Sequence, residues 1–241
     1  MLFSGRKYGL KMRYELVVFD IDGTITKHIS SWQFLHERLG QWDNQAIRYQ
    51  QMFLAGKISY RKFCRLDAAH WKGMEAGKLY KVLEEIPYSK NVERAVKILK
   101  DSGFKLAAVS TGIQFIIDRV KKELGFDYAL CNTLKVRRGK LTGGVEVKIS
   151  HLGKAKVLRS ILRRFEIDAR KVVVVGDSAG DIPMMRMAGY AIAFNASSQA
   201  VCEAADYCCL SDDFMEACEK ILEVSEAHSK AIKIDNPLDQ T

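Results

Sequence analysis

Short apolar runs alternate along the chain with longer stretches whose apolar residues recur at helical spacing. Three of these runs are continuous rather than interleaved with polar residues, which is typical of strands buried on both faces. They span Leu16–Phe19, Leu106–Val109 and Val172–Val175. Strands that alternate with helices predict a parallel α/β sheet, in which ligands lie beyond the carboxyl ends of the strands.

Three of the intervening stretches carry helix signals. Ser89 is expected to cap a helix that closes at Gly103. Residues 113–124 have helical periodicity, and Gly125 marks their end. Residues 157–162 place their apolar positions on one helical face and predict a third helix.

Two segments interrupt the alternation. Residues 27–88 contain only amphipathic helical stretches, and we interpret them as a cap inserted after the first strand. Residues 133–147 have apolar positions on both sides of a turn at residues 137–140, which indicates a β-hairpin. The expected fold class is therefore α/β, with a Rossmann-like three-layer parallel-sheet core, an inserted small helical cap and a β-hairpin flap.

The amino-acid composition limits the kinds of protein to which this chain can belong. The chain has 241 residues, 48% of them apolar, which suffices for one large core with a small insertion. It has no run of about eighteen apolar residues, so no membrane span is expected. Six cysteines without paired C-x-x-C spacing favour reduced thiols in a cytoplasmic protein over a zinc site or disulfides. The formal charge of +9 raises nucleic acid as a partner, but the basic residues form no single stripe with stacking aromatics.

Two aspartates follow the first predicted strand, in the order Phe19-Asp20-Ile21-Asp22-Gly23-Thr24. Two carboxylates this close at a buried strand end need a cation. Mg²⁺ is favoured, because it prefers carboxylate and carbonyl oxygens and can also bind a phosphate oxygen. Surface acids before a capped helix are the alternative, which leaves the preceding apolar run unexplained.

Further polar residues follow the other two predicted strands. Ser110-Thr111-Gly112 is expected to open a helix, where a hydroxyl and free amides can bind a phosphate oxygen. Lys154 stands at the start of a helix, an unusual place for a cation unless it bridges an aspartate and a phosphate. Asp177 and Asp181 form a second acidic pair at a strand end. Together, and in this order, these elements indicate a phosphate site with a metal ion.

The order D-x-D-G-T, S-T-G, Lys and G-D-x-x-x-D resembles the haloacid dehalogenase (HAD) superfamily in its phosphatase branch. Further segments are similar to phosphoserine-phosphatase-type members with a helical, C1-type cap: Val109–Gly112, Leu124–Ala129, Gly139–Gly143 and Gly189–Phe194. The resemblance implies a HAD-like catalytic core, a helical cap and terminal extensions. The expected boundaries are 12–26 plus 89–227 for the core, 27–88 for the cap, and 1–11 and 228–241 for the extensions.

The resemblance also implies roles for the motif residues. Asp20 would be the nucleophile that forms an aspartyl-phosphate, and Asp22 would protonate the leaving alkoxide and then activate the hydrolytic water. The implied phosphate-binding residues are Ser110, Thr111, Gly112 and Lys154. The implied ligands of the Mg²⁺ cofactor are Asp20, the backbone carbonyl of Asp22, Asp177, and Asp181 as a further ligand or as the partner of Lys154.

The positions that would contact the substrate depart from phosphoserine phosphatases. Where those enzymes carry an acid for the substrate amine, this chain has Ile29, and where they carry an arginine for the carboxylate it has Asp67. Arg61 or Arg65 could replace that arginine from a neighbouring turn. His28 and Tyr60 are further candidate substrate contacts, although aromatic residues at helical spacing more often pack inside a cap.

The expected function is Mg²⁺-dependent hydrolysis of a small phosphorylated metabolite. The nearest alternatives are phosphoserine phosphatase proper and a phosphotransferase or mutase. A non-catalytic RNA-binding module is the alternative from a different class, and the intact set of acids, serine and lysine argues against it. The sequence leaves a homodimer open.

Overall fold

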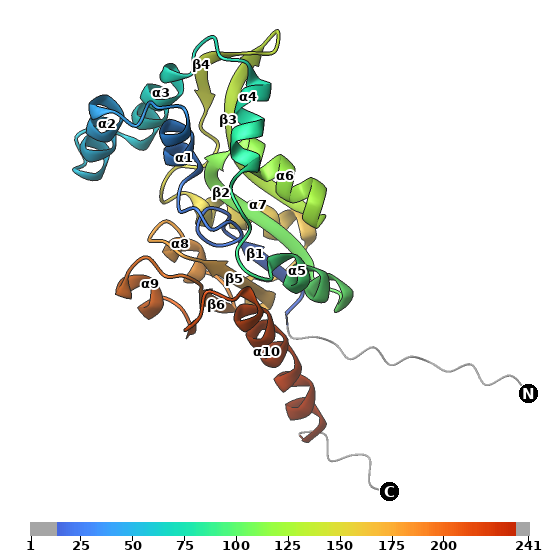
Figure 1. The fold of residues 1–241 in the computed structure, drawn as a ribbon. Coiled ribbons are helices and arrows are strands. Elements are labelled where there is room, and N and C mark those ends of the chain that lie inside the picture. Colours follow the sequence, from blue (N-terminus) through green and yellow to red (C-terminus); the bar gives the residue numbers. More distant parts are fainter. Residues whose placement is uncertain (1–13, 235–241) are drawn as a thin grey trace, which may run out of the picture.

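The computed structural model of the protein describes residues 14–234, apart from the side chains at 44 and 227–234. The predicted extension at 1–11 lies outside the described residues, as does the segment 235–241. The centre of the described chain is a seven-stranded sheet in the order β4-β3-β2-β1-β5-β6-β7 (Figure 1). Its strands are β1 (Leu16–Phe19), β2 (Lys105–Ile113), β3 (Tyr128–Arg137), β4 (Lys140–Glu146), β5 (Val172–Gly176), β6 (Tyr190–Ala193) and β7 (Tyr207–Cys208).

The three strands predicted from apolar runs are neighbours in this sheet. β1 lies between β2 and β5 and pairs with both in parallel, with Phe19 opposite Ala108 and Val175. β3 and β4 form the predicted hairpin, and theirs is the antiparallel pair among the described strands. Because β1 and β5 end in register, the polar residues that follow them are brought together at one edge of the sheet.

Helices cover both faces of the sheet. Val17 and Phe19 of β1 lie in one core with residues of α5 (Val92–Asp101), α6 (Gln114–Leu124) and α10 (Phe214–Ile234). Leu16 and Val18 lie in a second core with residues of α7 (Lys154–Phe165), α8 (Ile182–Met185) and α9 (Gln199–Glu203). A single turn of 3-10 helix, Ala169–Lys171, precedes β5. These three layers confirm the predicted fold class.

Four helices separate β1 from α5, and the last two of them lie beside the β3–β4 hairpin (Figure 1). They are α1 (Ser31–Arg38), α2 (Asn44–Leu54), α3 (Tyr60–His70) and α4 (Ala76–Glu84). Backbone hydrogen bonds join the α3–α4 connection to the hairpin, from Gly73 N to Leu141 O and from Leu141 N to Met74 O, both 2.8 Å. We propose that residues 27–88, which include these helices, form the cap, and we refer to them below as the proposed cap.

Ser89 does not cap α5, so that prediction is wrong. The residue before the helix is Asn91, in a left-handed conformation with φ 61°, and its side chain makes no capping hydrogen bond. The Ser89 hydroxyl instead donates to the carbonyl of Thr24 at 2.7 Å. Ser89 N donates to Ile25 O at 2.9 Å, so this serine ties the end of the proposed cap to the turn after β1.

α10 runs through Ile234, and the core boundary at residue 227 stays a prediction. One further expectation differs from the structure. Cys202 and Cys208 form a disulfide, which corrects the expectation of six thiols, whereas Cys64, Cys131, Cys209 and Cys218 are free. The pairing could not be read from the spacing, because the turn between α9 and β7 brings the two Cα atoms to 5.2 Å. No helix of the described chain is long and apolar enough to cross a membrane.

Candidate active site

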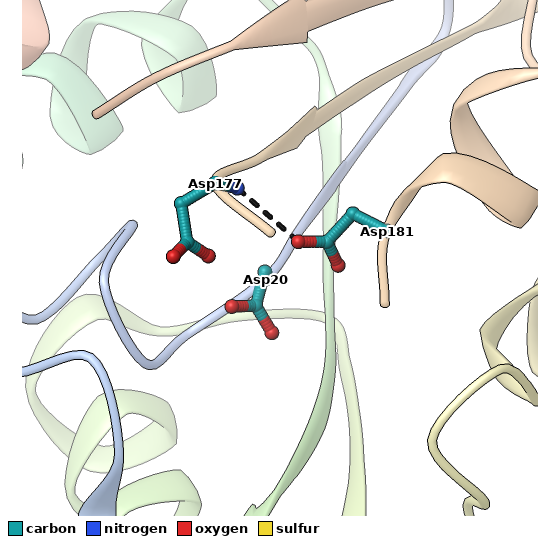
Figure 2. A group of neighbouring side chains, drawn as sticks. All are labelled: Asp20, Asp177 and Asp181. Carbon is teal, nitrogen blue, oxygen red and sulfur yellow. Dashed lines mark hydrogen bonds between the residues drawn. The ribbon is translucent and has the colours of Figure 1, made fainter. Parts of the chain in front are cut away.

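Three buried carboxylates meet at the carboxyl ends of β1 and β5. Asp20 directly follows β1, Asp177 directly follows β5, and Asp181 is the residue before α8. One oxygen from each lies within 4.8 Å of the others, and Figure 2 shows the three side chains turned toward a common point. Their residues are 3%, 3% and 0% exposed, so water cannot offset the charge repulsion among them.

The electrostatics of this cluster favour a bound cation. Burial raises the pKa of Asp177 to about 10, with Asp20 and Asp181 adding to the shift. Burial also raises the pKa of Asp20 to about 7, although the nearby Lys154 charge lowers it. These raised pKa values mean that the carboxyl groups tend to hold protons when no metal is bound. A divalent cation would take the place of those protons, and three carboxylate oxygens suit Mg²⁺. The Asp20–Asp177–Asp181 cluster is therefore a fitting metal site.

Gly23 allows the turn after Asp20 to lie against Asp177. Its φ is +87°, a conformation that residues with a Cβ rarely adopt. A Cβ at this position would also lie 2.8 Å from the Asp177 Cγ, closer than real contacts allow. Glycine here therefore keeps the Asp20–Asp22 turn and Asp177 in contact.

Lys154 joins Asp20 to Asp181. It is the first residue of α7, is 2% exposed, and its Nζ donates to the Oδ1 of Asp181 at 2.6 Å and to the Oδ1 of Asp20. Burial alone would lower the pKa of Lys154, but the two carboxylates raise it above its ordinary value, so the ammonium stays charged. Asp181 thus serves as the partner of Lys154, one of the two expected roles, while it also belongs to the carboxylate cluster.

Asp22 is held by a residue that the sequence did not point to. Its Oδ2 accepts hydrogen bonds from Ser31 N at 3.1 Å and from Ser31 Oγ at 2.8 Å. Its Oδ1 is buried and has no hydrogen-bond partner in the described chain. Burial raises the pKa of Asp22, while the bonds from Ser31 lower it. A carboxyl with a raised pKa and one free oxygen suits a group that holds a proton and then transfers it.

The segment Ser110-Thr111-Gly112 lies inside β2 and does not open a helix, because α6 begins two residues later at Gln114. Ser110 is buried, and its Oγ accepts from Gly112 N at 2.8 Å. A Cβ on Gly112 would lie 2.6 Å from Asp22 Oδ2 and 2.9 Å from Ser110 Oγ. The absence of a side chain at Gly112 therefore lets Asp22 and Ser110 lie on either side of it.

The carbonyl of Thr111 connects the proposed cap to the sheet. It accepts from Trp32 Nε1 at 3.1 Å, from Tyr60 Oη at 3.0 Å and from Asn132 Nδ2 at 2.9 Å. Trp32 lies on α1 and Tyr60 on α3, whereas Asn132 lies on β3. Asn132 is fixed in turn, because its Oδ1 accepts from Lys148 N and Ile149 N, each at 2.9 Å. These bonds hold α1 and α3 over the strand that carries Ser110.

Tyr60→Phe is expected to lower kcat/KM by about five- to tenfold, because one hydrogen bond of roughly 1 kcal/mol between the proposed cap and β2 is lost. Tyr80→Phe is the matched control, since its hydroxyl donates to Asp118 at an exposed position. The measurement is steady-state hydrolysis of one phosphate monoester by all three proteins. An unchanged kcat/KM in Tyr60→Phe would show that the Thr111 contact does not position the site.

A cavity of about 220 Å³ opens onto these residues. Asp20, Asp22, Thr111 and Lys154 line it, and so does Tyr60 among the expected substrate contacts. The other expected contacts do not line it. Arg61 and Arg65 are exposed, and His28 accepts from Ser30 N at 3.2 Å through its Nδ1 and lies beside Glu37.

Three residues near the site were missed, each with a weak signal in the sequence. Ser31 follows another serine at the start of α1, where only Ser30 is needed as the helix cap. Asn132 is a fully buried polar residue within a strand. His151, which lines the cavity, comes three residues before Lys154 in the connection to α7.

The chain belongs to the haloacid dehalogenase-like hydrolase family, whose model matches residues 17–186. A phosphoserine phosphatase from Archaeoglobus fulgidus is 33% identical over 182 residues, which cover 75% of this chain and 52% of the relative. The chain thus spans about half the length of that relative. A phosphoserine phosphatase from Methanocaldococcus jannaschii is 31% identical over 208 residues, which cover 86% of this chain and 97% of the relative.

Solved structures of similar proteins agree in fold. A phospho-aspartyl intermediate analogue of phosphoserine phosphatase aligns with a TM-score of 0.74 and 30% identity, over 86% of this chain and 99% of that one. A substrate-bound phosphoserine phosphatase aligns with a TM-score of 0.76 and 29% identity, over 87% and 99% of the two chains. The predictions of a HAD-type phosphatase and of phosphoserine-phosphatase-like character are confirmed.

Proposed function

We propose that this protein hydrolyses small phosphate monoesters through a covalent aspartyl-phosphate on Asp20, with Mg²⁺ as cofactor. The observation that carries the proposal is the buried cluster of Asp20, Asp177 and Asp181 with Lys154 bonded to two of its members. A cluster with this charge suits a dianionic phosphate only when cations balance it. When bound, Mg²⁺ would lower the repulsion between that phosphate and the attacking carboxylate.

In the proposed first step, the Asp20 carboxylate attacks phosphorus and the bond to the alcohol oxygen breaks. Asp22 gives its proton to the departing alkoxide, which its raised pKa favours. In the second step, Asp22 takes a proton from water, whose oxygen attacks phosphorus and releases phosphate from Asp20. Ser110 and Lys154 hold the phosphoryl oxygens, and the Thr111–Gly112 backbone lies beside them.

The direct test is release of p-nitrophenol from p-nitrophenyl phosphate. The protein is expected to turn over in Mg²⁺ and to be silent with excess EDTA, and added Mg²⁺ should restore activity. Turnover that persists in EDTA, or none in Mg²⁺, would contradict the proposal.

Phosphoserine is a specific second candidate for the substrate, because the relatives described above are phosphoserine phosphatases. A phosphotransferase or mutase differs in where the phosphoryl group goes, and free phosphate measured against phosphorylated or isomerised product separates the two. The cytoplasm remains the proposed compartment, which the four free cysteines favour and the Cys202–Cys208 disulfide does not.

A further inference from the structure

The cavity contains a carboxylate that the hydrolytic steps do not use. Asp67 on α3 lines the cavity and is 2% exposed. Its Oδ1 is enclosed by protein and faces His36, whose Nε2 lies 3.5 Å away at the outer limit for a hydrogen bond, so Oδ2 is the oxygen left for the cavity. A buried carboxylate with an unused oxygen is unfavourable by itself. Asp67 therefore suits a substrate group that can donate hydrogen bonds.

Aromatic side chains make up much of the remaining wall. They are Trp32, Trp42, Phe53, Tyr60 and Phe63. Two of them lie close together, since the ring centroids of Phe53 and Tyr60 are 5.5 Å apart. The faces of aromatic rings attract cations, and the attraction is stronger where water is excluded. A carboxylate among aromatic rings is a suitable environment for an ammonium group.

The same wall offers no free charged partner to a carboxylate on the substrate. Lys154 and His151 are its residues of basic type. Lys154 is already bonded to Asp20 and Asp181. Burial and the charge of Lys154 lower the pKa of His151, so its imidazole is neutral at pH 7. The Asp67 carboxylate would repel a second negative group near the leaving alcohol.

A neutral polyol is the competing ligand for Asp67, but two polar side chains of the lining are already engaged within the protein. The Gln33 amide already donates to Glu37 at 2.7 Å. The Ser30 hydroxyl already accepts from Gln33 N at 3.2 Å as the cap of α1. These two groups are therefore partly engaged within the protein, whereas the Asp67 carboxylate has only the long 3.5 Å contact with His36.

We propose that the preferred substrate is the phosphate monoester of an amino alcohol, whose leaving group carries an ammonium and no carboxylate. The ammonium lies against Asp67 and the aromatic wall while the phosphoryl group lies at Asp20. This inference depends on the proposed function for the hydrolysis of the ester, but not for the binding of the ammonium group. Binding of uncleavable analogues tests it separately.

The test uses three phosphonates that differ by one group at a time: butylphosphonate, 3-aminopropylphosphonate and 2-amino-4-phosphonobutyrate. Calorimetry of the full chain in Mg²⁺ is expected to show the amine binding about tenfold more tightly than the alkyl compound. Adding the carboxylate should remove most of that gain. Asp67→Asn should abolish the difference between amine and alkyl, whereas Glu75→Gln, an exposed residue outside the cavity lining, should keep it.

Turnover supplies the second measurement. O-Phosphoethanolamine is expected to exceed both O-phosphoserine and glycerol 3-phosphate in kcat/KM; Asp67→Asn should lose this preference, whereas Glu75→Gln should keep both the preference and its activity on p-nitrophenyl phosphate. Equal binding of the amine and alkyl phosphonates, tightest binding of the amino acid phosphonate, or a preference for glycerol 3-phosphate would each overturn the inference. If the wild-type protein cleaves none of the esters yet binds the amine most tightly, the proposed function fails and the ammonium site stands.

Discussion

Asp20→Asn is expected to lower turnover of p-nitrophenyl phosphate by about 10⁴-fold or more, because an amide cannot replace a carboxylate as the nucleophile. The change keeps the size of the side chain and removes one negative charge from a buried cluster of three. The pKa of Asp20 is already raised to about 7 by burial, so the metal-free variant should unfold at a temperature no lower than the wild type does. Steady-state rates and thermal unfolding in EDTA check both parts.

Asp101→Asn is the matched control for Asp20→Asn. Asp101 is an exposed residue at the end of α5, paired with Lys97. Its substitution should leave turnover unchanged, because a surface pair of this kind contributes little. If Asp20→Asn kept more than about a tenth of the wild-type rate, the assignment of the nucleophile would be wrong.

Lys154→Met is expected to have the largest effect on stability. The substitution leaves the carboxylates of Asp20 and Asp181 buried without the ammonium that donates to both. Removing one partner of such a buried pair costs about 3–5 kcal/mol of unfolding free energy. Urea unfolding in EDTA measures this loss. Mg²⁺ should recover part of it, because the ion would supply positive charge to the same carboxylates.

Lys156→Met is the control for this experiment. Lys156 is exposed on the same helix, and its replacement by methionine removes the same single positive charge. It should unfold within about 0.5 kcal/mol of the wild type. Equal urea midpoints for Lys154→Met and the wild type would mean that Lys154 does not hold the cluster together. Loss of turnover in Lys154→Met is also expected, because its ammonium is the proposed contact of a phosphoryl oxygen.

The parts of the fold predicted best were those with continuous apolar runs. β1, β5 and the Leu106–Val109 part of β2 are buried on both faces, so these stretches had to be apolar. β6 and β7 were not predicted, because they are short and begin with partly exposed tyrosines, Tyr190 and Tyr207. Ser89 was misassigned, since a serine before a helix can cap it or bond elsewhere, and only the returning chain brings Thr24 within reach.

The residues of the candidate site were also predicted only in part. Asp20, Asp22, Asp177 and Lys154 were singled out because acids or a buried cation at the ends of elements conflict with local preferences. Contacts between segments far apart in sequence were not predicted, such as Tyr60 and Asn132 meeting at the Thr111 carbonyl. Arg61 and Arg65 were considered for their charge, but they are exposed and do not line the cavity. Charge can be read from a sequence, whereas the direction of a side chain depends on how its helix packs.

Phosphorylation of Asp20 is the central claim, and chemical trapping tests it most directly. The wild-type protein would be mixed with a phosphate monoester in Mg²⁺, quenched in acid and reduced with borohydride, which converts an aspartyl-phosphate to homoserine. Peptide mass spectrometry is predicted to find homoserine at position 20, and only when substrate was present. Homoserine at Asp22 or Asp177, or its absence from protein quenched during turnover, would contradict the account.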